Sequence, residues 1–437
     1  MRQKCKEYLG ISFEPLKLIV TYICLFLGGC ILLILANLFP SERIRQNIAT
    51  SVDEFITEGN YPYMGVRKTS YALDNWTEAV LLSFYYTSNS DHPIYSAFVA
   101  TAYSPKDTTG VERLQYLLSD DAWEESSNLV NRSSYWLGYG IFLRPMLFFF
   151  DYQTCRMLLS TTAYVMLIVT VVLMAKKLGT YMAIGFGTTI TIFHYYALSL
   201  QYTLGIFCVF IVFAAILYLL YNKSRINYFY FMFIIGIASS FFEWLSIPLI
   251  TFGMPVLIML ELARKEKPDY PFAKYFNIVF QSGAGWCLGY GIMVISKTIA
   301  AMSVIGTEAW DYFLQRFSDN SSTIQLRSFI KILLNLVRCV FPFNMIDGNW
   351  EMVLVLAVIL LFWFAMIICF QKIRNLNSIL LLLAAAPFAW YWVFKGHVGH
   401  VGIEFRTLMI SYYSGWMFLG TVFGYVRKRL FIGDDQT

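Results

Sequence analysis

The chain contains far more continuous apolar sequence than a water-soluble protein can bury. Runs of about 20 mostly apolar residues, the length that crosses the hydrocarbon core of a bilayer, recur along the sequence. Hydrophobic residues make up 58% of the 437 residues and charged residues only 14%, whereas a soluble domain carries roughly 25% charged residues. The pattern therefore predicts an all-α protein that crosses a membrane many times.

Ten runs are candidate transmembrane helices. They cover residues 17–38, 155–175, 180–197, 203–221, 227–246, 247–262, 275–297, 351–371, 377–395 and 407–426. The run at 247–262 is short and contains Pro248 and Pro255, so the sequence leaves open whether it crosses fully. The first run is too long for the core of a signal peptide and no small-residue cleavage site follows it, so we expect an uncleaved span.

The basic residues predict the orientation of these spans, because lysine and arginine are concentrated in cytoplasmic connections. Six basic clusters all fall on one side of the ten-span arrangement, at residues 2–6, 176–177, 223–225, 264–274, 372–374 and 427–429. We therefore expect both termini in the cytoplasm and one transmembrane domain over 1–437. The two long connections, 39–154 and 298–350, then lie outside.

Both outer connections contain segments typical of helices at a membrane surface. Residues 43–58 carry apolar positions at helical spacing, and residues 135–150 are strongly apolar apart from Arg144. Residues 322–341 alternate basic and apolar positions, which predicts a basic amphipathic helix that lies on lipid headgroups. A tilted span is the alternative for that segment, but it would place the later basic clusters on the wrong side.

Two other features exclude common classes of protein. The net charge of +5 is dispersed in short clusters between apolar runs, so it does not predict nucleic-acid binding. Most of the eight cysteines lie inside apolar runs, where they are typical of small buried side chains rather than disulfides.

Asp74 and Glu78 are the first candidate catalytic residues. They lie four residues apart and hence on one face of a helix that continues into the apolar run 79–86. Two carboxylates held close beside a low-dielectric surface raise the pKa of one of them, which makes it a usable general base. The same spacing also suits a helix N-cap followed by an acidic residue in the first turn, and the sequence leaves both interpretations open.

Three further charged residues are candidates for substrate binding. Arg144 and Arg156 bracket an apolar helix, where an arginine either binds a phosphate through two hydrogen bonds or extends towards lipid headgroups. Glu243 lies close to the outer end of the fifth span, where a carboxylate is costly unless it is paired or faces a wet cavity. We expect Glu243 to face a wet cavity.

The segment 395–406 combines His397, His400, Glu404 and Arg406 between the last two spans. The spacing of the two histidines is not that of a known zinc site, so a hydrogen-bonding cluster around a sugar or phosphate fits better. We assign no metal ligand and no certain cofactor. A divalent metal is compatible with this cluster but is not indicated by it.

The order of these features resembles the GT-C superfamily of membrane glycosyltransferases, which includes protein O-mannosyltransferases and lipid A aminoarabinose transferases. Residues 137–150 resemble the apolar juxtamembrane helix of those enzymes, and residues 151–160 (DYQTCRMLLS) resemble their Asp-x-x-x-x-Arg-x-x-Ser beginning of the second span, with one more residue here between Arg156 and Ser160. Residues 176–179 (KKLG) resemble its cytoplasmic end. The resemblance extends to about residue 260. Ser134-Tyr135-Trp136 stands where many members have His-Pro-Pro.

The resemblance implies a specific activity. Such enzymes pass a sugar from a polyprenyl-phosphate donor to a glycan, lipid or protein acceptor outside the cytoplasm, among membrane lipids. Asp74 would activate the acceptor, with Glu78 as second choice. Arg144, Arg406 and the helix 322–341 would face the donor phosphate. The expected location is a bacterial cell membrane.

Two other classes are alternatives. A transporter or flippase for a lipid-linked glycan would need charges in the middle of spans and paired repeats with broken helices, and the sequence has few such charges and no clear internal repeat. A membrane O-acyltransferase would need a deeply embedded histidine, whereas His194, His397 and His400 all lie near the expected outer edge.

Overall fold

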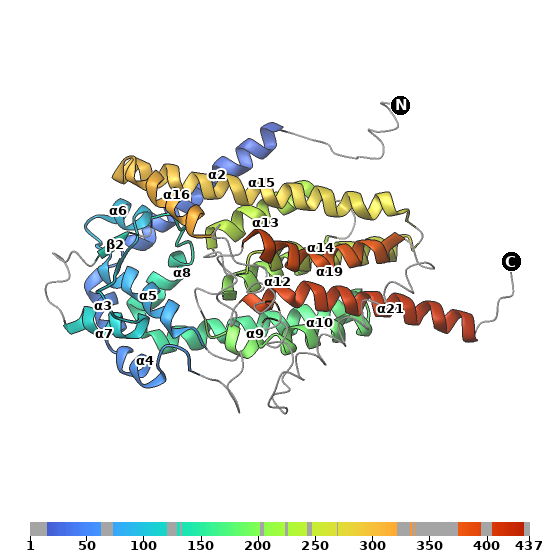
Figure 1. Cartoon of the computed structure of the whole chain (residues 1–437), viewed down its shortest axis with the longest axis horizontal. Coiled ribbons are helices and arrows are strands. Elements are labelled where there is room, and N and C mark those ends of the chain that lie inside the picture. The colour runs from blue at the N-terminus through green and yellow to red at the C-terminus, as the bar shows by residue number, and fades with distance from the viewer. Residues whose placement is uncertain are drawn as a thin grey trace.

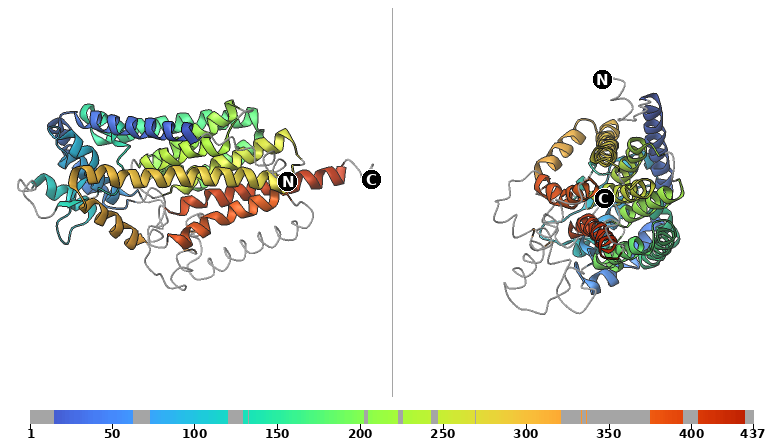
Figure 2. Two further views of the ribbon diagram at one scale, coloured as in Figure 1. Left: turned by 90° about the horizontal axis from the view of Figure 1, so that it is seen from above. Right: turned by 90° about the vertical axis from the view of Figure 1, so that its right-hand side faces the viewer.

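The computed structural model is almost entirely helical (Figure 1). It describes residues 15–62, 73–119, 129–131, 133–201, 205–222, 226–242, 247–268, 270–320, 333, 336, 375–394 and 404–431. Long helices form an elongated bundle, and a group of shorter helices covers one end of it (Figures 1 and 2).

The bundle contains the helices that the apolar runs predict. Their bounds are α2 (Pro15–Asn37), α9 (Tyr152–Lys177), α10 (Thr180–Ile192), α12 (Phe207–Tyr221), α13 (Tyr228–Phe242), α14 (Leu249–Glu266), α15 (Phe272–Ile305), α19 (Asn375–Val393) and α21 (Met409–Phe431). The short α11 (Tyr195–Leu198) joins α10 to α12. Of the described helices, α2, α9, α15 and α19 are long and apolar enough to cross a membrane. The predicted span at 351–371 lies outside the described residues.

Lipid is the solvent that this bundle requires. Large apolar side chains remain exposed along α2 and α9, for example Ile31 (56% exposed) and Ile168 (61%). Only 17% of the most apolar window of α2 and 22% of that of α9 is buried inside the protein. A soluble protein does not leave apolar faces of this size in water, so the chain is a helical membrane protein.

The closest helix pair in the bundle is α13 against α15, and glycine makes this contact possible. A Cβ atom on Gly285 would lie 2.1 Å from the Phe229 carbonyl oxygen, and one on Gly289 would lie 2.1 Å from that of Phe233. On α13, a Cβ atom on Gly236 would likewise lie 2.3 Å from the Trp286 carbonyl oxygen. Small residues allow helix backbones to approach in this way inside membranes.

The group of shorter helices, here called the cap, consists of the described residues between 41 and 149. It contains α3 (Ser41–Ala49), α4 (Val52–Glu58), α5 (Asn75–Thr87), α6 (Pro93–Phe98), α7 (Gly110–Ser119) and α8 (Gly140–Phe149). The sequence predicted only helices here, but β1 (Thr101–Tyr103) and β2 (Leu129–Asn131) form a small antiparallel sheet. After α15, α16 (Glu308–Asn320) lies beside the cap (Figure 1).

The predicted surface helix at 43–58 is two helices, α3 and α4, and protein covers its apolar side. Ile44, Ile48 and Phe55 are fully buried, because α3 packs against α5 and α8 and α4 packs against α7. Helical spacing alone does not show whether an apolar face is covered by lipid or by protein. The sequence therefore predicted the helical segment but not the helices that pack on it. The predicted helix at 322–341 lies outside the described residues apart from two isolated positions.

Three hydrogen bonds fix the cap to α13 and α15. The Trp136 indole donates to the Met293 carbonyl of α15 at 2.8 Å, and the Gly138 amide donates to the Phe241 carbonyl of α13 at 3.1 Å. The Lys297 ammonium of α15 donates to the Phe98 carbonyl at the end of α6 at 2.5 Å. The cap is therefore held against the same two helices that pack most closely in the bundle.

Replacing Gly289 by alanine is expected to destabilise the protein by about 2 kcal/mol, because the added methyl forces α13 and α15 apart. The unfolding midpoint in detergent measures the effect. Gly291→Ala is the matched control: it lies two residues away in α15, has open space around its Cβ position, and should leave the midpoint unchanged or slightly raised. Equal midpoints for the two variants would contradict the close packing.

Candidate functional site

Arg156 is the centre of a buried polar cluster where the cap meets the beginning of α9. One of its terminal nitrogens lies 3.3 Å from Oε2 of Glu58, and the other donates to Oδ1 of Asn75 at 3.0 Å. Asn75 in turn donates to Oε2 of Glu58 at 2.7 Å. The guanidinium also lies over the rings of Tyr152 (4.9 Å) and Phe55 (5.6 Å).

Glu78 lies deeper in the same cluster. Its side chain is fully buried, and the Tyr152 hydroxyl donates a hydrogen bond to its Oε2 atom. The charge of Glu78 also acts on Arg156. A buried carboxylate is tolerated only where a cation and hydrogen-bond donors compensate for its lost hydration, and here Tyr152 and Arg156 supply both from α9.

Asp74 is the N-cap of α5, which is the alternative that the sequence left open beside the paired-carboxylate interpretation. Its Oδ1 accepts from the Thr77 amide at 2.9 Å and its Oδ2 from the Thr77 hydroxyl at 2.8 Å. An aspartate cap stabilises a helix by about 1 kcal/mol. Only 3% of Asp74 is exposed; burial and the nearby charge of Asp74 raise the pKa of the half-exposed Tyr61 hydroxyl to about 12.

Glu58 and Glu78 therefore come from two segments of the cap and meet α9 at one boundary, and Asp74 caps the helix that carries Glu78. We call Glu58, Asp74, Glu78, Tyr152 and Arg156 the carboxylate site. Its position follows from local structure: α4 ends at Glu58, α5 begins after its cap at Asp74, and α9 begins at Tyr152. Three element ends that meet in this way bring charged side chains together beside the apolar core.

Arg144 does not belong to this site. Its guanidinium donates to the Ala36 carbonyl at 3.0 Å, to the Phe39 carbonyl at 3.4 Å and to the Ser88 hydroxyl, and only 1% of the residue is exposed. Burial lowers the pKa of this guanidinium to about 10, so it keeps its charge at neutral pH. These contacts join the end of α2, the end of α5 and α8, which is a structural role.

Two tyrosine hydroxyls lie between Arg144 and Glu78. Tyr85 and Tyr139 are fully buried, and within the described part of the chain their Oη atoms have no hydrogen-bond partner. Burial raises the pKa of both hydroxyls, and the charge of Glu78 adds to the effect. Both groups therefore stay protonated and can donate.

The predicted cluster at 395–406 is described in part. Glu404 and Arg406 are buried at the turn that leads into α21, where the Tyr391 hydroxyl donates to the Glu404 carbonyl at 2.6 Å. The Arg406 guanidinium lies 5.1 Å from the centre of the Phe405 ring, and the His194 ring lies 5.5 Å from that same centre. His397, His400 and Glu243 lie outside the described residues.

One face of α9 connects the carboxylate site to this second cluster. Ser160, one turn after Arg156, forms a hydrogen bond of 3.0 Å with Ser199, and the Tyr164 ring packs against that of Tyr195. The turn that contains Tyr195 and Ser199 also contains His194, which contacts Phe405. The two candidate groups are thus joined by one continuous set of contacts.

Sequence reasoning missed Glu58, Asn75 and Tyr152. Glu58 precedes Asp74 by 16 positions and no spacing rule relates them. Tyr152 stands out in the sequence only as part of residues 151–160, the segment that resembles the GT-C enzymes. The one available signal was that all three sit at the end of a predicted helix, where side chains can reach a neighbouring element.

Comparison with known proteins gives no relative: the chain matches no family model, no curated protein and no solved structure. Among the residues that the structure describes, no group of three or more His, Cys, Asp or Glu side chains is arranged to hold a metal ion.

Replacing Arg156 by glutamine is expected to destabilise the protein by about 3 kcal/mol, because removal of one partner leaves buried carboxylates uncompensated. Adding Glu58→Gln to that variant should restore part of the loss, since the two residues are coupled. Unfolding in detergent measures both. Arg43→Gln, at an exposed arginine of the cap, is the control and should change stability by less than about 0.5 kcal/mol. Strict additivity of the two site substitutions would show that the pair is not coupled.

Proposed function

We propose that the protein is a membrane glycosyltransferase of the GT-C type, which transfers a sugar from a polyprenyl-phosphate donor to a glycan, lipid or protein acceptor on the extracytoplasmic face. One observation carries the proposal. The cap holds Asp74 and Glu78 on the beginning of one helix, at the boundary between cap and bundle and beside Arg156. A cap made from the first long connection, with carboxylates at its base, suits chemistry on a lipid-linked substrate at a membrane surface.

The reaction needs a base and a place for a leaving phosphate. The acceptor oxygen forms a bond to C1 of the sugar while the bond from C1 to the phosphate oxygen breaks, and the acceptor proton passes to a carboxylate. The products are the glycosylated acceptor and polyprenyl phosphate. General-base catalysis of this kind contributes about 10²- to 10⁴-fold to the rate.

Asp74 is the better candidate for the base. Glu78 is fully buried and bonded to Tyr152, so its position suits a supporting charge. Asp74 is also buried, but it stands at the N-terminus of α5 and its charge acts on the half-exposed Tyr61 hydroxyl, so it is the carboxylate nearer to a surface group. Its two bonds to Thr77 fix the direction of the carboxylate and leave further lone pairs on both oxygens.

We assign the donor phosphate to the second cluster, with Arg406 as its cation. The bonds that occupy Arg144 and Arg156 favour structural roles for both of them. Arg406 precedes the first turn of α21, and a helix N-terminus adds a partial positive charge there. His397, His400 and Glu404 belong to the same segment and complete the proposed substrate-binding group, and Glu243 stays a candidate for it.

We further propose ten membrane crossings, formed by the bundle helices together with the run at 351–371, with both termini in the cytoplasm of a bacterial cell. The basic ends of α9 and α14 meet, because the Lys265 ammonium donates to the Lys177 carbonyl at 3.1 Å. Basic residues thus gather at the end of the bundle away from the cap.

Asp74→Asn is expected to lower sugar transfer at least about 100-fold, because the amide cannot accept the acceptor proton, while Glu78→Gln should retain transfer. Release of label from a set of polyprenyl-phosphate sugars by the protein in detergent measures it. Glu42→Gln, at an exposed carboxylate of the cap, is the control. Full activity of both site variants would refute the catalytic assignment, and movement of the donor across a bilayer without transfer would identify a flippase instead.

The proposed orientation predicts which ends of the bundle are accessible from each side of the membrane. In a cysteine-free background, a cysteine at the exposed position 116 of the cap should react with an impermeant maleimide added outside intact cells. A cysteine at the exposed position 267 after α14 should react only after the cells are opened. The reverse pattern would overturn the orientation.

A further inference from the structure

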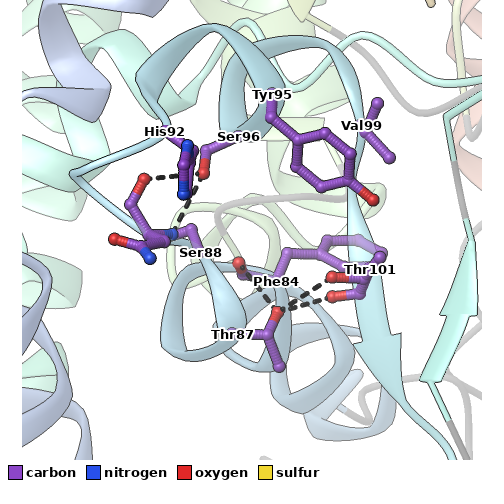
Figure 3. A pocket seen from close by; sticks show the side chains of 9 residues that line it. Phe84, Thr87, Ser88, His92, Tyr95, Ser96, Val99 and Thr101 are labelled. Carbon is purple, nitrogen blue, oxygen red and sulfur yellow. Dashed lines mark hydrogen bonds between the residues drawn. The ribbon is translucent and has the colours of Figure 1, made fainter. Parts of the chain in front are cut away.

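A cavity lies in the cap, at the opposite end of α5 from Asp74. It has a volume of about 400 Å³ and opens between the end of α5, the helix α6 and the strand β1 (Figure 3). Thirteen residues of α5 separate the two ends, which corresponds to about 20 Å along a helix. The cavity is therefore distinct from the carboxylate site and has the volume of a small-molecule pocket.

The lining of this pocket combines hydroxyl, amide and imidazole groups with apolar surface, and it carries no acidic, lysine or arginine side chain. Several of its hydroxyls are already bonded within the cap: Thr87 donates to the Thr101 carbonyl at 2.7 Å, and Ser96 to the Asn89 carbonyl at 2.9 Å. These bonds hold the two walls together (Figure 3). The pocket therefore has a fixed shape before any ligand arrives.

Three polar groups of the lining remain for a ligand. In the part of the chain that the structure describes, the His92 ring, the Nδ2 amide of Asn89 and the Tyr95 hydroxyl form no hydrogen bond within the protein, and all three side chains lie exposed at the open side of the pocket. The other amide atom of Asn89, Oδ1, accepts from the Asp91 amide at 2.8 Å. The side chain is thus held in place with its two N–H donors left over.

Aromatic rings supply the apolar part of the pocket. The ring of Tyr95 lies above that of Phe84, and His92 and Ser88 lie to one side of the two rings (Figure 3). A sugar ring has an apolar face of C–H groups that packs on aromatic rings, and hydroxyls at its edge that pair with amide, imidazole and phenol groups. An acyl chain would leave these polar groups unpaired, and a phosphate would find no cation in the lining.

We propose that this pocket binds a neutral sugar residue of a glycan acceptor, at a point remote from the reacting hydroxyl. The identity of that glycan as an acceptor rests on the proposed function, whereas sugar binding in the pocket does not. Ser88 fixes the base of the pocket, because its hydroxyl accepts from the buried Arg144 and donates to the Tyr85 carbonyl at 2.7 Å. Binding energy from a remote sugar would hold the acceptor while its other end reacts.

Saturation-transfer NMR on the full chain in lipid nanodiscs tests the proposal without any detergent that contains a sugar. The probes are the methyl glycosides of glucose, galactose, mannose and N-acetylglucosamine, added one at a time. We expect at least one of them to receive saturation from the aromatic rings. Tyr95→Ala and Asn89→Asp should each weaken its binding about fivefold, the size of one lost stacking or hydrogen-bonding contact. Asn89→Asp keeps the Oδ1 acceptor and loses the donors.

Two controls separate this proposal from the others. Tyr116→Ala removes an exposed tyrosine of the same cap outside the pocket and should leave binding unchanged, as should Asp74→Asn. The absence of saturation transfer to every probe, or equal binding by Tyr95→Ala and the unmodified protein, would overturn the pocket assignment. Sugar transfer and sugar binding are measured separately. A failure of the pocket assignment would therefore leave the transfer assay unchanged, and an absence of transfer activity would leave the measured sugar binding unchanged.

Discussion

The arrangement of the cap depends on one buried charge, the guanidinium of Arg144. A guanidinium removed from water must be surrounded by acceptors, because an unpaired buried charge costs several kcal/mol. Arg144 meets this demand with carbonyls at the end of α2 and a hydroxyl at the end of α5. Satisfying a single side chain thus fixes the last turn of the first bundle helix, the helix that bears Asp74, and the base of the sugar-sized pocket relative to one another.

A second buried arginine organises the other end of α5. Arg156 binds Glu58 and Asn75 directly, and its neighbour Tyr152 binds Glu78. Both residues belong to the first turns of α9, so the helix that enters the bundle also carries the compensating groups for the cap's acids. The two arginines hold α5 between them, with a carboxylate site at one end and a neutral, aromatic pocket at the other. This division separates the proposed general base from the pocket proposed to hold a remote sugar of the acceptor.

Much of the architecture could be predicted from the sequence, because membrane-spanning helices are selected by length and hydropathy alone. The helices near 17–38, 155–175 and 275–297 appear with few shifts, although α15 is longer than predicted. What could not be predicted is which groups meet. Asp74 and Glu78 were identified, but their partners Glu58 and Tyr152 come from other elements at no fixed spacing. Arg144 looked like a phosphate ligand because nothing local indicates that the carbonyls of Ala36 and Phe39 lie within reach. The pocket between Phe84 and Tyr95 has no motif at all, since its walls are ordinary helix and strand residues.

The length of α15 has a consequence for how the cap is carried. Its 34 residues span about 51 Å at 1.5 Å per residue, whereas the hydrocarbon core of a bilayer is about 30 Å thick. Tilting the helix accommodates only part of the extra length, so one end of α15 extends beyond the hydrocarbon core. Met293 and Lys297, which bind the cap, lie in its second half, beyond the contacts of Gly285 and Gly289 with α13. The position of the cap relative to the bundle is thus set by the geometry of one continuous helix.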